Sequence, residues 1–274
     1  MSFIHQKKLK RNIKRALVLF ITVYIMIAAS LYFLQEKLML FPTVLEQDYK
    51  YQFSYSYEEL FFKTEDNAVI NANHFKAEQT KGVILYFHGN AGDLSRWGII
   101  AEYFVEKNYD VLVIDYRTYG KSTGPLSEAA FYNDADLSYN YLKERYAESE
   151  ITVYGRSLGT GIATFITSKH QPKQLILETP YYNIADVAKQ RFSMFPVESL
   201  LKYRFPTNEF IQSVECPILI VHGTDDDVVP LSSGEKLLKE ASKQKIKFVK
   251  IEGGRHNNLN EFDAYHQAID EVLN

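Results

Sequence analysis

The chain has 274 residues, of which 46% are hydrophobic and 24% charged; these values are typical of a globular protein and exclude a disordered or fibrous chain. The formal net charge of −3 gives no electrostatic basis for binding nucleic acid. A single cysteine excludes an internal disulfide framework and any zinc site built from several cysteines.

The N-terminus joins a basic segment to an apolar one. Residues 1–15 contain six basic side chains and no acidic one, and residues 16–34 contain no charged side chain. A helix of that apolar length, at about 1.5 Å per residue, spans roughly the 30 Å hydrocarbon core of a bilayer. We therefore expect a basic cytoplasmic tail at 1–15 and a transmembrane anchor at 16–34.

The charges around this segment predict its orientation. Basic residues concentrate on the cytoplasmic side of membrane helices, so the catalytic domain is expected to be exported: to the periplasm or cell exterior of a bacterium, or the lumen of a eukaryotic compartment. A buried core helix and a signal peptide cleaved near Ala28-Ala29-Ser30 are the alternative interpretations. The apolar run continues past that point, which favours an uncleaved anchor.

After a juxtamembrane connection at 35–56, strand and helix patterns alternate through residues 57–274. This alternation predicts an α/β fold with a mostly parallel, doubly wound sheet. The first two expected strands form an antiparallel hairpin, and the later apolar runs are typical of strands buried on both faces. The expected strands are 60–63, 69–75, 83–87, 111–114, 151–154, 175–177, 218–221 and 248–251. The expected helices lie near 94–107, 127–147, 158–170, 232–242 and 258–273.

Capping-box spacing predicts where the last two helices begin, with Ser232 paired to Glu235 and Asn258 to Glu261. Residues 180–212 break the alternation with a stretch that is rich in proline, tyrosine and phenylalanine. An excursion between two strands, above the carboxyl ends of a parallel sheet, is a common position for a cap or substrate pocket. The same aromatic side chains are also compatible with simple packing onto the sheet.

A Gly-Arg-Ser-Leu-Gly motif occupies residues 155–159, directly after an expected strand and at the start of an expected helix. This is the context of a nucleophile elbow, in which a serine lies on a sharp strand-to-helix turn. The helix N-terminus adds a positive dipole where negative charge develops during acyl transfer. Ser157 is therefore the candidate nucleophile.

A serine nucleophile needs a base and an orienting carboxylate, in the chain order serine, acid, histidine. Of the seven histidines, only His256 and His266 follow the candidate acids. His266 falls inside the last expected helix, whereas His256 lies in a glycine-containing turn after a strand, so His256 is the expected base. His88 and His222 also end strands, and we expect them to bond loop backbone.

Four carboxylates are candidates for the acid. Asp225, Asp226 and Asp227 directly follow an expected strand, and Glu178 ends the preceding one. Three adjacent carboxylates are also compatible with a solvated turn that caps the next helix. The spacing from the preceding glycine and the following Val-Pro pair favours Asp226.

An oxyanion hole needs two backbone donors. A His-Gly-Asn-Ala-Gly sequence at 88–92 follows the expected strand 83–87, in the loop that supplies one N–H in this architecture. We expect Asn90 to provide that N–H and Leu158, the residue after Ser157, to provide the other.

These motifs resemble the α/β-hydrolase superfamily, particularly its small single-anchor membrane members related to palmitoyl-thioesterases and serine-aminopeptidase-like hydrolases. The resemblance extends over roughly residues 32–272. It differs from the usual pattern at Thr118, where a glycine is usual, and at Arg255, where a small residue is common. The matching segments are LYFHGNAG at 85–92, DYR at 115–117, YGKS at 119–122, GRSLG at 155–159, LETP at 177–180 and HGTDD at 222–226.

The resemblance implies an α/β-hydrolase fold and a serine-dependent hydrolase of ester, thioester or amide bonds that uses no metal or organic cofactor. Its triad would be Ser157, His256 and Asp226, acting through an acyl-enzyme. Because the anchor places the site beside a membrane, the expected substrate is an ester or thioester of a lipid or a small acyl group. A peptidase or amidase of the serine-aminopeptidase type is the alternative, and a catalytically silent membrane-bound binding protein is a second.

Overall fold

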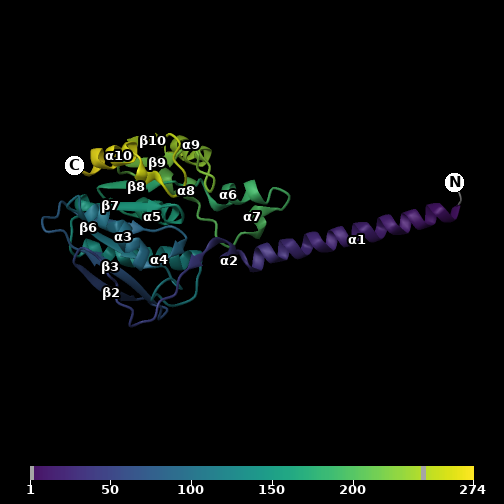
Figure 1. The fold of residues 1–274 in the computed structure, drawn as a ribbon, viewed down its shortest axis with the longest axis horizontal. Helices are drawn as coiled ribbons and strands as arrows, with labels where there is room; N and C mark the ends of the chain where they lie inside the picture. The colour runs from purple at the N-terminus through teal and green to yellow at the C-terminus, as the bar shows by residue number, and fades with distance from the viewer. Residues whose placement is uncertain (1–2, 242–244) are drawn as a thin grey trace.

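The computed structural model describes residues 3–241 and 245–274, and a large mixed sheet forms the centre of the protein (Figure 1). Its eight strands are ordered β10-β9-β8-β7-β4-β6-β3-β2. Strands β6, β4, β7, β8, β9 and β10 are parallel, as the alternation predicted, and β2 and β3 form the predicted antiparallel hairpin. Strand β3 is also antiparallel to β6. The strands are β2 (Tyr57–Lys63), β3 (Val69–Phe75), β4 (Val83–Phe87), β6 (Asp110–Ile114), β7 (Ile151–Arg156), β8 (Gln174–Glu178), β9 (Ile218–Gly223) and β10 (Ile246–Ile251).

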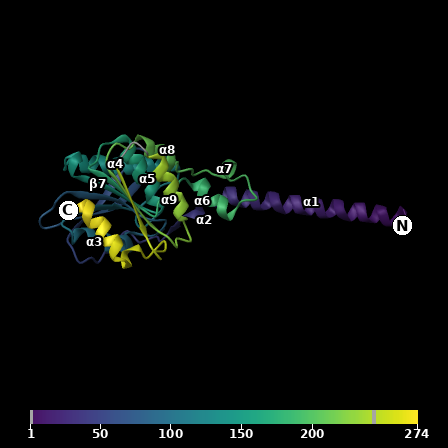
Figure 2. The same ribbon diagram turned by 90° about the horizontal axis from the view of Figure 1, so that it is seen from above.

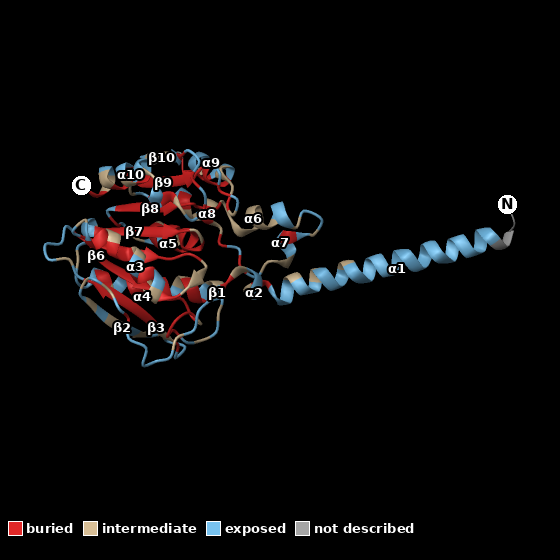
Figure 3. Ribbon diagram, viewed as in Figure 1, coloured by how far each residue is buried: buried red, intermediate tan, exposed pale blue. Residues whose placement is uncertain are grey.

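Helices cover both faces of the sheet because successive strand residues point to opposite sides. In β4, Val83, Leu85 and Phe87 join one apolar core, and Ile84 and Tyr86 join the other. Figure 2 shows α3 and α4 on opposite sides of the sheet, and Figure 3 shows the buried strands between the helices. The covering helices are α4 (Glu128–Lys143), α5 (Leu158–Lys169) and α9 (Leu231–Glu240) on the first core, and α3 (Leu94–Val105) and α10 (Asp263–Leu273) on the second.

Neither of the two predicted capping boxes forms. Helix α9 begins at Leu231 with Pro230 in the N-cap position, so Ser232 lies inside the first turn and caps nothing. The segment predicted as one helix over 258–273 is a short 3-10 turn, η3 (Leu259–Glu261), followed by α10. The Asn258 side-chain oxygen accepts the Arg255 N–H at 2.7 Å and is thereby withdrawn from capping. Residue 242, the expected end of the helix before β10, lies outside the described residues.

Helix α1 (Phe3–Phe33) projects away from the domain, as Figures 1 and 3 show. Over His5–Phe33 its most apolar window has a mean hydropathy of 2.3, and none of that window is buried. The helix is long and apolar enough to cross a membrane, and it also includes the basic tail. It is a candidate transmembrane span in the region where the sequence predicts one.

The connection at 35–56 is packed onto the domain. It contains α2 (Gln35–Met39) and β1 (Phe41–Pro42), which pairs in parallel with β5 (Ala91–Gly92) in the loop after β4. Leu40 and Tyr51 in this connection are buried. The chain therefore enters the domain directly beside the loop that carries Asn90.

The excursion at 180–212, here called the cap, separates β8 from β9. Its α6 and α7 lie on the side of the domain from which α1 projects (Figure 1). Tyr181, Tyr203 and Phe205 are buried in the core, so part of the aromatic content does pack onto the sheet. The cap contains α6 (Ile184–Arg191), α7 (Val197–Leu200), α8 (Thr207–Phe210) and the 3-10 turn η2 (Ile211–Ser213).

Candidate active site

Ser157 lies on the sharp turn between β7 and α5. Its backbone has φ 50° and ψ −115°, a conformation that is rare outside glycine and costs of order 1–3 kcal/mol. A Cβ at Gly155 would lie 2.6 Å from the Gly159 carbonyl oxygen, and a Cβ at Gly159 would overlap the Phe87 carbonyl. The two glycines of the motif are therefore required by close packing of β7, α5 and β4.

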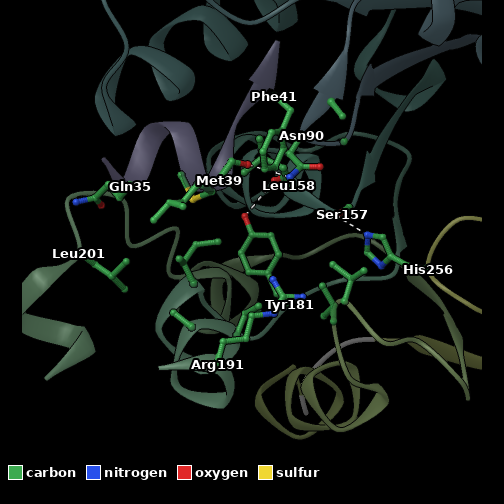
Figure 4. Close-up of a pocket in the computed structure, with 18 of the residues that line it drawn as sticks. Gln35, Met39, Phe41, Asn90, Ser157, Leu158, Tyr181, Arg191, Leu201 and His256 are labelled. Carbon is green, nitrogen blue, oxygen red and sulfur yellow. Dashed lines mark hydrogen bonds between the residues drawn. The ribbon is translucent and has the colours of Figure 1, made fainter. Parts of the chain in front are cut away.

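Ser157, His256 and Asp226 form one hydrogen-bonded chain, part of which is visible in Figure 4. The His256 Nε2 atom lies 2.9 Å from Ser157 Oγ, and its Nδ1 atom lies 2.8 Å from Asp226 Oδ2. The histidine comes from the loop after β10 and the aspartate from the loop after β9. The structure thus brings together three side chains that are separated by 69 and 30 positions along the sequence.

Asp226 is held as an anion by its surroundings. Its Oδ1 atom accepts the backbone N–H groups of Val228 and Val229 at 2.9 and 2.8 Å. Burial alone would raise the pKa of Asp226, but hydrogen bonds from His222 and His256 outweigh it, and the pKa lies well below its usual range. An ionised Asp226 accepts the Nδ1–H of His256, which leaves Nε2 free to accept the Ser157 proton.

The other candidate carboxylates lie elsewhere. Asp225 and Asp227 are exposed. Glu178 is buried, and its Oε1 atom lies 3.2 Å from Arg156 Nε, while its Oε2 atom accepts the hydroxyl of Tyr154. It therefore belongs to an ion pair behind the elbow and makes no hydrogen bond to His256.

The remaining histidines at strand ends bond backbone, in keeping with the expected structural role. His88 Nδ1 lies 2.6 Å from the Gly89 carbonyl oxygen, and His222 Nε2 lies 2.8 Å from the Val229 carbonyl oxygen. His222 also lies 3.5 Å from Asp226 Oδ2, a contact that the sequence did not indicate.

Asn90 and Leu158 both lie beside Ser157 in the same cavity (Figure 4). The neighbouring Gly89 is so close that a Cβ there would lie 3.8 Å from Ser157 Cβ. Leu158 is the first residue of α5, where backbone N–H groups have no acceptor within the helix. The Asn90 side-chain Nδ2 donates to the Met39 carbonyl at 2.9 Å, which fixes the loop.

These residues open onto a cavity of about 490 Å³. Apolar side chains of the cap and of residues 31–41 make most of its wall. Its charged side chains, among the described residues, are Arg96, Arg156 and Arg191, and no aspartate or glutamate lines it. No group of three metal-ligating side chains occurs within residues 3–241 and 245–274.

Sequence reasoning missed the arginines and the contribution of the N-terminal connection to the cavity. Arg96 and Arg191 belong to no motif, and only the unusual composition of the cap pointed to that region. Tyr181 was also missed; its hydroxyl donates to the Leu158 carbonyl at 3.0 Å and so supports the first turn of α5.

Comparison with known proteins agrees with the α/β fold described above. The profile of the serine aminopeptidase family S33 matches residues 78–210 and 207–263. The solved structure of a Pyrococcus furiosus esterase superposes with a TM-score of 0.68, covering 86% of this chain and 97% of the esterase at 17% identity. At that identity the likeness shows the fold alone.

Two curated relatives represent the sequence matches. Protein bem46 of Schizosaccharomyces pombe is 28% identical over 268 residues, covering 90% of this chain and 89% of the relative. The lysophosphatidylserine lipase ABHD12 of Danio rerio is 35% identical over 183 residues, covering 60% of this chain. The match covers 48% of the length of the zebrafish protein.

Proposed function

Because the chain belongs to the serine aminopeptidase S33 family of α/β hydrolases, we propose that it is a membrane-anchored serine hydrolase that cleaves carboxylic ester or thioester bonds. The observation that carries the proposal is the hydrogen-bonded chain from Ser157 through His256 to Asp226 at the wall of the cavity. Ester hydrolysis also agrees with the esterases and lipases among the similar proteins.

In the proposed mechanism, Ser157 Oγ attacks the substrate carbonyl carbon while His256 Nε2 takes its proton. The Asn90 and Leu158 N–H groups donate to the resulting oxyanion. The protonated His256, stabilised by Asp226, then gives the proton to the leaving alcohol or thiol, and an acyl-Ser157 ester remains. Water, deprotonated by His256, attacks this ester and releases the acid.

A fluorophosphonate probe tests the nucleophile, since it labels only activated serines. The protein should be labelled at Ser157, and Ser157→Ala should remove both labelling and ester hydrolysis. Ser95 at the start of α3 offers a matched control, and Ser95→Ala should be labelled like the parent chain. Labelling of another serine in Ser157→Ala would contradict the assignment.

The cavity favours lipid esters over peptides. An aminopeptidase must hold a substrate ammonium group, for which a carboxylate is the usual partner. The cavity instead carries Arg96, Arg156 and Arg191 and, within the described residues, no carboxylate. Paired ester and amide substrates with the same acyl group test this choice, and faster amide cleavage would favour the peptidase alternative.

The arginines favour an anionic headgroup beside the acyl chain. Arg156 is paired with Glu178, but within the described residues no carboxylate lies within ion-pair distance of Arg96 or Arg191. The lysophosphatidylserine lipase activity named for the ABHD12 relatives is of this class. We expect Arg191→Gln to raise the KM for an anionic lysophospholipid by about tenfold and that for lysophosphatidylcholine much less. Arg204→Gln, in the cap but outside the cavity, should change neither KM, and equal effects of Arg191→Gln on both lipids would contradict the headgroup assignment.

We further propose that α1 spans the membrane uncleaved, with residues 1–15 in the cytoplasm and residues 35–274 on the far side. The support is the concentration of basic residues before the apolar stretch. Protease added to intact spheroplasts should remove a C-terminal tag from an exported domain. A tag that is cut only after lysis would show the opposite orientation. A mature N-terminus near residue 31 would show that the N-terminal segment is cleaved off.

A further inference from the structure

The cap contacts the N-terminal segment at two levels. In α2, just beyond the domain end of α1, Gln35 donates to the Leu200 carbonyl at 3.2 Å and accepts the Lys202 N–H at 2.8 Å. Much farther along α1, the Tyr24 hydroxyl donates to the Met194 carbonyl at 3.1 Å. The Tyr24 ring stacks on Phe195 with centroids 4.8 Å apart. The loop between α6 and α7 therefore extends along the apolar part of α1.

The position of Tyr24 sets the depth of this loop. Tyr24 lies ten residues before Leu34, which corresponds to about 15 Å along a helix, or half of a roughly 30 Å hydrocarbon core. A span shifted toward the N-terminus would have to include the basic residues of 1–15, at a high cost in hydrocarbon. Once residues 16–34 span the bilayer, the contacts of Tyr24 place Met194 and Phe195 below the membrane surface.

The loop is suited to this environment. Residues 192–197, Phe-Ser-Met-Phe-Pro-Val, carry no charge, and the Met194 side chain is 73% exposed. Lys189 and Glu198, which flank the loop, form an ion pair with each other. Charged residues therefore border the loop, and an uncharged, partly exposed tip lies between them.

Irregular backbone is tolerated in hydrocarbon only when its polar groups have partners. The Phe195 N–H donates to the Phe192 carbonyl at 3.0 Å, and the Val197 N–H donates to the Phe195 carbonyl at 2.8 Å. Pro196 has no N–H, and the Met194 carbonyl accepts the Tyr24 hydroxyl. Much of the polar backbone of this tip is thus satisfied within the protein.

We propose that residues 192–197, here called the cap tip, are immersed in the bilayer beside α1, and that acyl chains pass from the lipid directly into the cavity. Leu31 and Leu38 wall the cavity on the anchor side, and Phe192 and Leu200 wall it on the cap side. The cavity wall thus includes residues of both elements that we place in the membrane, Leu31 of α1 and Phe192 of the cap tip. This inference rests on the membrane anchoring proposed above.

Depth-dependent quenching tests the location. Cys216 is the only cysteine, so Cys216→Ala allows single-cysteine variants of the full chain, labelled with a nitrobenzoxadiazole dye, in phosphatidylcholine vesicles. Lipids with a spin label at acyl carbon 12 should quench Met194→Cys nearly as strongly as Ile25→Cys on α1. They should leave Phe61→Cys, on edge strand β2, unquenched.

The two possible failures are distinguishable. An unquenched Met194→Cys beside a quenched Ile25→Cys would place the cap tip outside the bilayer and overturn the inference, while the anchoring would stand. If neither label is quenched, α1 does not lie in the bilayer, and the anchoring and the inference both fail.

Turnover tests the route of the acyl chain. Met194→Asp places a charge where we expect hydrocarbon, so it should lower turnover of a long-chain ester embedded in vesicles by at least about tenfold. Hydrolysis of a short, soluble ester should stay within about twofold, since Met194 does not line the cavity. Phe61→Asp, the matched control, should change neither rate. Unchanged turnover of the embedded ester, or an equal loss with both substrates, would overturn the role in lipid access.

Discussion

Asp226→Asn is the sharpest test of the proposed triad, because the structure determines how the new amide must sit. Asp226 Oδ1 accepts two backbone N–H groups, from Val228 and Val229. The amide oxygen of an asparagine satisfies these donors, so it takes the place of Oδ1. The amide NH₂ then occupies the place of Oδ2, 2.8 Å from His256 Nδ1.

An NH₂ group donates and cannot accept, so His256 must carry its proton on Nε2 instead of Nδ1. That proton points at Ser157 Oγ, 2.9 Å away, and the histidine no longer acts as a base. Loss of the correct tautomer in this way lowers kcat by about 10⁴. KM should change little, because Asp226 does not line the cavity.

The assay is steady-state hydrolysis of a soluble short-chain ester by the full chain in detergent, with unfolding measured in parallel. Asp225→Asn and Asp227→Asn alter exposed neighbours and should retain kcat within about tenfold. An Asp226→Asn enzyme that is folded and retains more than about a tenth of the parental kcat would refute the reasoning. Loss of activity confined to Asp227→Asn would do so as well.

Three further variants test the structure around the site. The free energy of unfolding of Ser157→Gly should be about 1–3 kcal/mol higher than that of Ser157→Ala, because glycine adopts φ 50° and ψ −115° without strain. Equal free energies of unfolding in denaturant titrations would contradict the strained elbow. Glu178→Gln leaves the buried Arg156 without its partner and should destabilise the fold by about 3 kcal/mol, whereas a catalytic loss without destabilisation would make Glu178 a triad candidate again. Burial and the neighbouring Lys76 charge lower the pKa of His74 from its usual 6.5 to about 4. As the pH drops from about 6.5 toward 4, His74 is therefore protonated in the unfolded chain before it is protonated in the folded one, and the free energy of unfolding falls. The loss should reach about 2 kcal/mol at pH 5 relative to pH 7.5 in denaturant titrations, and His74→Gln should lack this part of the pH dependence.

The central strands of the sheet were predictable because they are buried on both faces and therefore form continuous apolar runs. Residues 69–75 and 83–87 were predicted as strands with the bounds that β3 and β4 have. Strand β7 continues two residues beyond its predicted end, through Gly155 and Arg156. These residues lack apolar side chains, but they pair with Leu177 and Glu178 of β8. Pairing between strands is a non-local property that a single strand's composition does not contain.

The arrangement around the site was less predictable for the same reason. Ser157, His256 and Asp226 could be selected from the order of strands and loops, since each follows a strand of the parallel sheet. The contact of Tyr24 with the cap could not, because it joins residues 170 positions apart without a motif at either end. Thr118 has φ 72° at the position where the family usually has a glycine, and the sequence alone does not show that threonine is accommodated there.

The connection that follows the anchor is hydrogen-bonded to the proposed oxyanion loop and is not a loose linker. The Met39 carbonyl accepts the Asn90 side chain at 2.9 Å, and the Phe41 N–H donates to the Asn90 carbonyl at 2.8 Å. Because the side chain and carbonyl of Asn90 are both held, the direction of its N–H is constrained as well. A chain that begins at residue 35 keeps both contacts, whereas one that begins at residue 43 loses both. A fall in kcat of the shorter chain on a soluble ester would therefore reflect the oxyanion loop, whereas the cavity wall lost with residues 35–41 would raise KM.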